Sequence, residues 1–171
     1  MPDGVLLHMR FAYADPPYVG VSHRYPEKLE VDHPALVARL IADYPDGWAL
    51  SCKSSSLQQL LPLCPERVRL GAWVKPFAAF KINVNPMYAW EPVIFYRGRR
   101  RGRGKPTMND WIKTNTVIKQ SVLGEKPELF VFWLIEMLGM ESGDELDDLF
   151  PGSGNVTRSV KLWRSQRRMF A

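Results

Sequence analysis

The chain has 171 residues, of which 46% are hydrophobic and 24% are charged, so it is long enough for one globular domain with a buried core and is not globally disordered. Its formal net charge of +5 favours a polyanionic partner such as nucleic acid. The only cysteines, Cys52 and Cys64, suggest neither a disulfide framework nor a metal site, and this usage fits a reducing cytoplasm.

The N-terminus does not resemble a secretory signal, because Asp3 stands where such a signal is basic. The most apolar segment, residues 129–138, is about half as long as a span of the bilayer requires. We therefore expect a soluble cytoplasmic protein without a membrane partner.

The first predicted strand is the apolar run at residues 11–14, and the motif Asp15-Pro16-Pro17-Tyr18 follows it. Two consecutive prolines end strand pairing and hold the chain extended. The Asp15 carboxylate and the Pro16 carbonyl then form two acceptors beside the Tyr18 ring, which suits a flat heterocycle with an exocyclic amine. The alternative is an ordinary strand-ending turn with a hydrogen-bonded Asp.

Helices and strands alternate in the next part of the chain. We expect a surface loop at 22–28, a helix capped by Asp32 with Leu36, Val37, Leu40 and Ile41 as its apolar face, strands at 48–52, 68–74 and 91–96, a short helix at 54–61, and an irregular stretch at 75–86. This order indicates a mostly parallel sheet that is covered by helices.

Residues 98–105 break this alternation with a run of cationic residues among glycines, namely Arg99, Arg100, Arg101, Arg103 and Lys105. The run has no face to bury, so it predicts an exposed loop. Arginine suits phosphate binding because its guanidinium donates two parallel hydrogen bonds. The alternative is a solvated run of charge without a ligand.

Lys126-Pro127-Glu128 predicts the start of a helix with proline at its first position. The helix continues through residues 129–138, which are apolar on nearly every side, so we expect it in the interior or between two layers.

An acidic strand end at Asp148 then precedes the turn Gly152-Ser153-Gly154 and another helix. The two glycines let the backbone approach a ligand closely, and the free N–H groups at the helix start favour a carboxylate or phosphate. The alternative is a common strand-to-helix turn.

Together, Asp15-Pro16-Pro17-Tyr18 and the stretch from Asp148 to Gly154 resemble the catalytic and S-adenosylmethionine (SAM)-binding motifs of DNA amino-methyltransferases. Lys126-Pro127 resembles the motif that precedes the cofactor loop in that family. The catalytic motif comes first and the cofactor motif last, as in the circularly permuted β group. The strand at 91–96 resembles a late strand of adenine-specific members, and the resemblance extends from about residue 11 to residue 156.

The resemblance implies an α/β fold with a three-layer, Rossmann-like and mostly parallel methyltransferase sheet, in which the strand before Asp148 lies beside the strand before Asp15. It implies methyl transfer from SAM to the N6 amine of adenine in DNA. Asp15 and Pro16 would hold the amine, with Pro17 and Tyr18 completing the catalytic motif and Tyr18 stacking on the base. The residues implied in cofactor binding are Asp15, Lys126, Pro127, Asp148, Phe150, Gly152, Ser153 and Gly154.

The chain departs from the family pattern in two ways. The residues after Gly154 form mostly one basic, helix-like tail at 157–168, so we expect the last strands of the family and its ribose-binding acid to be missing. We expect one domain over residues 1–171, in which a short basic insertion at 97–124 replaces a target-recognition domain.

Three functions stay open from the sequence. The first is a DNA adenine methyltransferase of restriction–modification or phage type, in a bacterial or phage-infected host. The others are an RNA adenine methyltransferase and a catalytically weak nucleic-acid-binding subunit of a methyltransferase complex. A partner subunit or a second copy of the chain would supply the missing elements.

Overall fold

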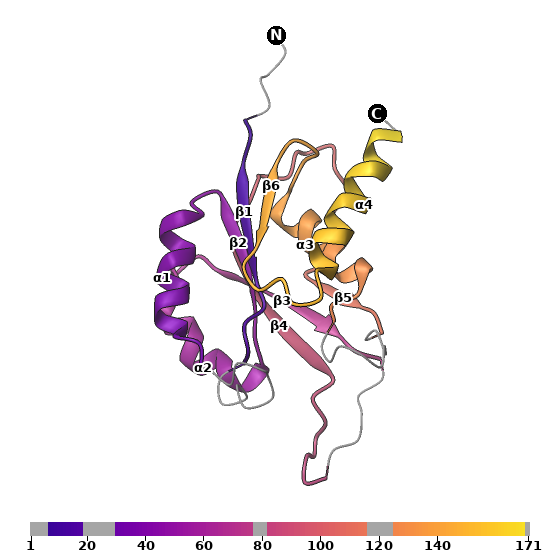
Figure 1. The fold of residues 1–171 in the computed structure, drawn as a ribbon. Coiled ribbons are helices and arrows are strands. Elements are labelled where there is room, and N and C mark those ends of the chain that lie inside the picture. Colours follow the sequence, from indigo (N-terminus) through magenta and orange to yellow (C-terminus); the bar gives the residue numbers. More distant parts are fainter. Residues whose placement is uncertain (1–6, 19–29, 77–81, 116–124, 170–171) are drawn as a thin grey trace.

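The computed structural model describes residues 7–18, 30–76, 82–115 and 125–169. The strands are β1 (Arg10–Ala14), β2 (Gly47–Ser51), β3 (Arg69–Val74), β4 (Trp90–Arg97), β5 (Trp111–Lys113) and β6 (Glu145–Asp148). The helices are α1 (His33–Asp43), α2 (Leu57–Leu60, between short 3₁₀ turns at Ser54–Ser56 and Leu61–Leu63), α3 (Glu128–Leu138) and α4 (Asn155–Met169). Figure 1 shows three layers, with α1 and α2 on one face of the sheet and α3 and α4 on the other.

The six strands form one sheet in the order β5-β3-β4-β2-β1-β6. Strand β4 runs antiparallel to β2 and β3, whereas the other pairs are parallel, which confirms the mostly parallel α/β sheet. Strand β1 pairs with β6 in the register Tyr13 to Asp148, as expected for the strands that precede the two motifs. The carboxyl ends of these two strands therefore meet at one edge of the sheet.

Local signals account for the start of α1 and for both ends of α3. Asp32 caps α1, because its Oδ1 atom accepts a hydrogen bond of 2.9 Å from the backbone N–H of Ala35. The predicted apolar face of α1 is buried except at Ile41, which is 38% exposed. Helix α3 starts one residue later than predicted, because Pro127 is extended, and it ends at Gly139 in the left-handed conformation.

Helix α3 lies between the sheet and α4, as predicted, and forms the centre of one hydrophobic core. Its buried residues are Phe130, Val131, Trp133, Leu134, Ile135 and Leu138. The Trp133 ring meets Phe95 of β4 edge to face, with the ring centroids 5.4 Å apart. On the other face of the sheet, Leu36, Val37 and Leu40 of α1 belong to a second core.

Some expectations were wrong or fall outside the described residues. Strand β5 was not predicted, because three residues that are mostly exposed carry no periodic pattern. The loop at 22–28, residues 77–81 of the irregular stretch and residues 116–124 of the basic insertion lie outside the described residues. Within the described ranges, no helix has both the length and the apolar character needed to cross a membrane.

The close packing of α3 on β3 makes Gly71 a sensitive position. A Cβ atom there would lie 2.8 Å from both the Phe95 and Trp133 rings. We expect Gly71→Ala to lower the free energy of unfolding by about 1–3 kcal/mol, because the rings must shift. Urea denaturation measures this loss, and Gly104→Ala is the control because no atom lies within 4 Å of a Cβ there. Equal losses in the two variants would contradict the packing argument.

Candidate active site

The two motifs leave the sheet side by side at the carboxyl ends of β1 and β6. The backbone N–H of Leu149 donates to the Tyr13 carbonyl at 2.9 Å, so the pairing of the two strands continues just beyond Asp148. Asp15 then follows β1, and the glycine turn follows β6. Ligands of open α/β sheets bind at such carboxyl ends.

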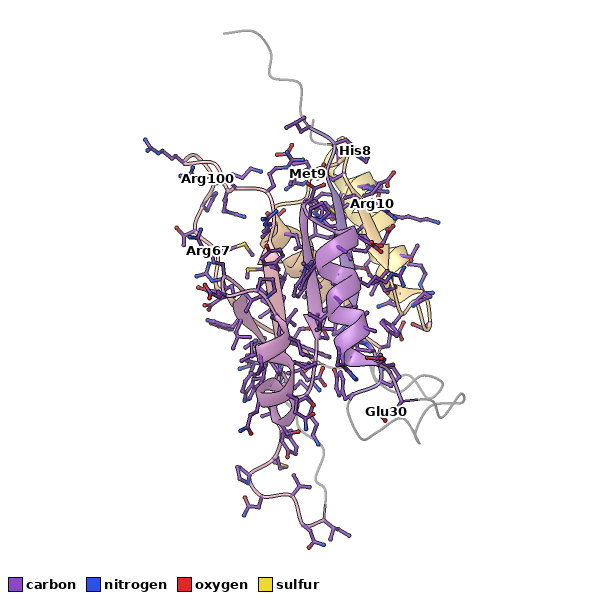
Figure 2. All side chains as sticks on the ribbon, turned by 90° about the vertical axis from the view of Figure 1, so that its left-hand side faces the viewer. His8, Met9, Arg10, Glu30, Arg67 and Arg100 are labelled. Carbon is purple, nitrogen blue, oxygen red and sulfur yellow. The ribbon has the colours of Figure 1, made fainter. Side chains whose placement is uncertain are left out.

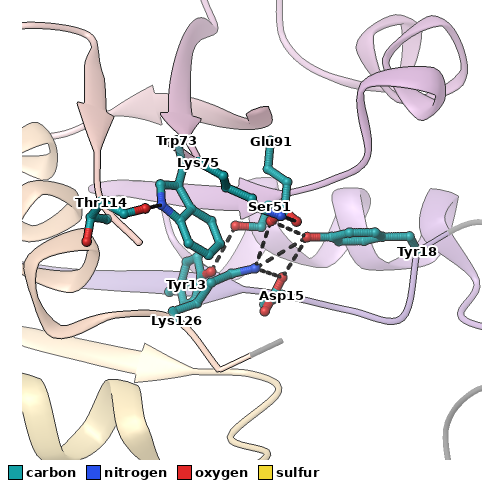
Figure 3. A network of polar contacts seen from close by, with 9 residues as sticks. All are labelled: Tyr13, Asp15, Tyr18, Ser51, Trp73, Lys75, Glu91, Thr114 and Lys126. Atoms are coloured by element: carbon teal, nitrogen blue, oxygen red, sulfur yellow. Dashed lines mark hydrogen bonds and ion pairs between the residues drawn. The ribbon is translucent and has the colours of Figure 1, made fainter. Parts of the chain in front are cut away.

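A buried lysine connects Asp15 to the middle of the sheet (Figure 3). The Lys126 Nζ atom lies 3.0 Å from Asp15 Oδ1 and 3.2 Å from Glu91 Oε2, and its side chain is only 5% exposed. The same ammonium lies 5.2 Å from the centre of the Trp73 ring. Two carboxylates and an aromatic face thus compensate the loss of water around this charge.

Tyr18 and Lys75 complete the polar network around Glu91. The Tyr18 hydroxyl donates to Glu91 Oε2 at 2.9 Å and lies 3.5 Å from Asp15 Oδ1. The Lys75 ammonium forms an ion pair with the other Glu91 oxygen. The network therefore contains two lysines and two carboxylates, so its charges balance.

The surroundings shift the pKa values of Asp15 and Glu91 in opposite directions. Burial raises the pKa of Asp15 above its ordinary value, although Lys126 acts in the opposite direction. Burial acts in the same way on Glu91, but Lys126 and Lys75 together hold the pKa of that carboxyl below its ordinary value. Asp15 is therefore the more easily protonated of the two acids.

Two hydrogen donors of the network, Lys126 and Tyr18, keep their protons. Burial would lower the pKa of Lys126, but Asp15, Tyr13 and Glu91 raise it well above its ordinary value. Burial also raises the pKa of Tyr18, with Asp15 and Glu91 adding to the effect, so its hydroxyl stays a donor at neutral pH.

The glycine turn is open above its backbone. Gly152 and Gly154 have φ values of +44° and +73°, in the left-handed region that favours glycine. A Cβ atom built on either glycine would have no contact closer than 3.6 Å, so there is room for a ligand against the backbone. Glu125 supports the turn, because its Oε1 atom accepts hydrogen bonds from Ser153 Oγ at 3.4 Å and Arg158 Nη2 at 3.1 Å.

Lys126 also joins the two motifs through its backbone. The Asn155 side-chain amide, at the start of α4, donates to the Lys126 carbonyl at 2.5 Å. The Lys126 side chain contacts Asp15. The acidic motif and the glycine turn are thus held against one residue that precedes α3.

Asp148 has an unpaired oxygen beside the turn. Its Oδ1 atom accepts from the Phe150 backbone N–H at 3.3 Å, whereas Oδ2 is buried and has no hydrogen-bond partner within the described part of the chain. Burial also raises the pKa of this carboxyl. Such an oxygen next to an open turn fits the ammonium group at the methionine end of SAM.

The predicted arginine loop lies at the other end of the sheet. It follows β4, whose last residue, Arg97, pairs with Gly47 at the start of β2. The expectation of an exposed loop is wrong for Arg99, whose side chain is 18% exposed and lies 2.7 Å from Asp144 Oδ1. This cation holds the loop to the start of β6, away from the two motifs.

The remaining cationic residues of the loop fall into two groups. Arg101 and Lys105 form longer ion pairs with Glu136 and Glu141, at 3.4 Å and 3.6 Å. Arg100 and Arg103 are exposed and have no side-chain partner among the described residues.

Sequence reasoning missed Glu91, Lys75 and Glu125 as parts of the site. Glu91 gives the only available signal, because it is a charged residue at the start of an otherwise apolar strand. Lys75 and Glu125 belong to stretches without periodicity, and only the folded chain brings them to the two motifs.

Comparison with known proteins gives matches among solved structures only. No protein-family model and no curated protein matches the chain. The crystal structure of the M1.HpyAVI–SAM complex matches with a TM-score of 0.64 and 16% identity, over 92% of this chain and 79% of the other. A second crystal structure of M1.HpyAVI matches with a TM-score of 0.62 and 15% identity, over 92% and 78%.

The chain has a methyltransferase Rossmann-like fold. The first of these M1.HpyAVI structures is a complex with SAM, the cofactor that the sequence motifs of this chain predict. At 15–16% sequence identity, the structural likeness shows the shared fold and not the roles of individual residues. The residue roles therefore depend on the geometry described above.

Replacing Lys126 tests the buried network. We expect Lys126→Met to lower the free energy of unfolding by about 3 kcal/mol at pH 7, because Asp15 and Glu91 lose the cation between them. Without Lys126, the folded-state pKa values of both carboxyl groups rise relative to those in the parent chain, because Lys126 lowers both. The destabilisation is therefore full at pH 7 and shrinks as the pH falls and the groups are protonated.

Chemical denaturation from pH 4 to pH 7 measures this dependence. Lys161→Met is the control, because Lys161 is exposed on α4 and has no ion pair within the described residues. A loss in Lys126→Met that stays constant across this pH range would contradict the role assigned to the ammonium.

Proposed function

We propose that the chain transfers the methyl group of SAM to the exocyclic N6 amine of adenine in DNA. The observation that supports this best is the meeting of Asp15 and the glycine turn at one edge of the sheet, with Lys126 between them. These segments come from opposite ends of the sequence. A methyltransferase needs a site for the amine and a site for the methyl donor next to each other.

In this proposal, Asp15 and Pro16 bind the target amine. The Asp15 carboxylate and the Pro16 carbonyl accept hydrogen bonds from its two N–H groups, which orients the amine so that its nitrogen lone pair can attack the methyl group. The nitrogen would give up one of these protons as it is methylated, with Asp15 as the nearest acceptor. The rate then comes from positioning and from fixed charges, without a covalent bond to the protein. Pro17 and Tyr18 border the base, and the Tyr18 ring stacks on it.

Glu91 and Lys126 act as positioning residues. Glu91 holds the Tyr18 hydroxyl at 2.9 Å and thereby orients the ring. Lys126 holds Asp15 and stabilises its ionised form against the effect of burial. The Lys126 ammonium is directed at Asp15, so we assign its side chain the role of positioning this carboxylate. Only the Lys126 backbone, together with Pro127, would then border the cofactor.

The residues after β6 would hold SAM, which supplies an electrophilic methyl group when it is bound. The open backbone at Gly152 and Gly154 allows close approach, and the unpaired Asp148 oxygen can accept a hydrogen bond from the ammonium. Phe150 and Ser153 border the same space.

Two alternatives keep part of this chemistry. The same amine site would accept adenine in RNA, so the substrate must be tested in both forms. Strand β6 is at the edge of the sheet, and α4 is the only element that follows it in the described residues. This favours, as a second candidate, a nucleic-acid-binding subunit whose partner or second copy completes the site.

Replacing the acid should separate chemistry from cofactor binding. We expect Asp15→Asn to lower methyl transfer about 10²- to 10³-fold and to leave SAM affinity nearly unchanged, because the carboxylate contacts the amine. Tritiated methyl transfer to unmethylated DNA and RNA measures the first, and calorimetry the second. Asp147→Asn is the control, since Asp147 pairs with Arg10 and Tyr44 outside the site. Equal rates in Asp15→Asn and the parent chain would sink the assigned role.

Replacing Gly152 in the turn should impair cofactor binding first, in contrast to the replacement of Asp15. We expect Gly152→Val to weaken SAM binding at least tenfold, because a branched side chain fills the open space and resists a φ of +44°. Gly143→Val is the matched control, since no atom lies within 4 Å of a Cβ there. If the parent chain binds no SAM, alone or with a candidate partner, the proposed function is wrong.

A further inference from the structure

A hollow lies at the opposite end of the sheet from the proposed active site. It has a volume of about 300 Å³ and lies where β3 begins, where β4 ends and where α3 ends. Its lining residues are Arg67, Arg69, Phe95, Arg97, Arg99, Arg101, Met108, Glu136 and Met137. Five of these nine residues are arginines, and only one is acidic. We call it the arginine pocket.

The acidic residue that lines the arginine pocket and the one behind it are already paired. Glu136 lies 3.4 Å from Arg101 and 2.7 Å from Arg167 of α4. Arg99 lies 2.7 Å from Asp144, which is buried behind it. The local carboxylates are thus used by the arginines at the back of the pocket.

Three guanidinium groups of the pocket are not neutralised. Arg67 and Arg69 are exposed and have no ion pair within the described residues. Arg97 donates a 3.0 Å hydrogen bond to the Pro45 carbonyl and lies over the Tyr96 ring, but it too has no ion pair within the described residues. Like charges around one hollow repel each other unless an anion lies between them. The pocket therefore has an excess of positive charge that an anionic ligand would balance.

The chemistry of the lining favours a phosphate on a nucleotide chain. Guanidinium groups bind phosphate oxygens through two parallel N–H groups. In a pocket with few carboxylates, these N–H groups are free to bind a phosphate. Phe95, Met108 and Met137 provide an apolar wall in the same hollow. A sugar or base attached to the phosphate can pack on that wall.

Helix α3 sets the distance between the pocket and the proposed active site. Lys126 lies just before the helix, and Glu136 and Met137 are in its last turn. Its 11 residues correspond to a length of about 16 Å. This equals roughly five base pairs along a DNA duplex. Figure 2 shows Arg67 and the exposed Arg100 along the same side of the molecule.

We propose that the arginine pocket binds a backbone phosphate of the nucleic-acid substrate about five base pairs from the target base. The proposal relies on the proposed function only for the identity of the partner. The pocket would anchor the duplex in a chain whose predicted basic insertion is too short for a recognition domain. The phosphate would contact Arg67, Arg69 and Arg97. The ion pairs of Arg99 and Arg101 with Asp144 and Glu136 would keep the lining of the pocket in place.

The test uses the full chain and a fluorescent 20-base-pair DNA duplex, without SAM, over a series of salt concentrations. We expect Arg67→Gln/Arg69→Gln to weaken binding and to reduce the slope of log affinity against log salt by about one to two units, one for each lost phosphate contact. Both side chains are exposed and unpaired, so the variant should keep the melting temperature of the parent.

The control variant Arg39→Gln/Lys161→Gln removes the same charge from exposed positions of α1 and α4. Equal changes in slope for the two double variants, or no change in either, would overturn the proposal. The proposal would also be overturned if the parent chain binds inorganic phosphate at the pocket but Arg67→Gln/Arg69→Gln binds DNA with the same salt slope as the parent. If the double variant does not fold, Arg67→Gln alone gives the same comparison against Arg39→Gln.

The outcome is independent of catalysis. A parent chain that binds no SAM but shows the expected loss of slope in Arg67→Gln/Arg69→Gln would refute the methyltransferase proposal and leave the arginine pocket supported. A chain that binds SAM and transfers methyl groups with an unchanged slope in that variant would do the reverse.

Discussion

The structure of the proposed active site depends on the burial of one ammonium group. Lys126 can lose its water only because Asp15 and Glu91 lie at 3.0 Å and 3.2 Å from its Nζ atom. Those acids come from the end of β1 and the start of β4, and Asn155 of α4 holds the Lys126 carbonyl. Lys126 therefore holds together three segments that are far apart in the sequence, two through its charge and one through its backbone carbonyl.

The two ends of the sheet have different electrostatic designs. At the carboxyl end of β1, the network around Lys126 pairs two lysines with two carboxylates, so this network has no net charge before any ligand arrives. At the other end, arginines outnumber the available acids around a hollow. A neutral, preorganised site suits chemistry on an uncharged base, and an unbalanced basic site suits a phosphate backbone. Helix α3 joins the two, because it begins beside one and ends beside the other.

Local patterns in the sequence were sufficient for the scaffold and for the two motifs. The cap at Asp32, the apolar helix at 129–138 and the Asp-Pro-Pro-Tyr turn each depend on neighbouring residues, so their form follows from short-range sterics and periodicity. The alternation of strands and helices also predicted the mostly parallel sheet, and the order of the motifs predicted that β1 and β6 would be neighbours. These features need no knowledge of distant contacts.

Only the tertiary structure decided which charges became partners. Arg99 belongs to a run that looks solvated, yet it pairs with the buried Asp144, because the reversed direction of β4 brings its end to the start of β6. Likewise Arg67 and Arg69 join the arginine pocket, and Glu91 joins Asp15, across separations that no local pattern records. The sequence alone predicted the two motifs and the chemistry that we propose for them. The fold determined their common edge, their lysine and the distant basic pocket, because the energy of an ion pair depends on distance and burial in space, and chain spacing sets neither.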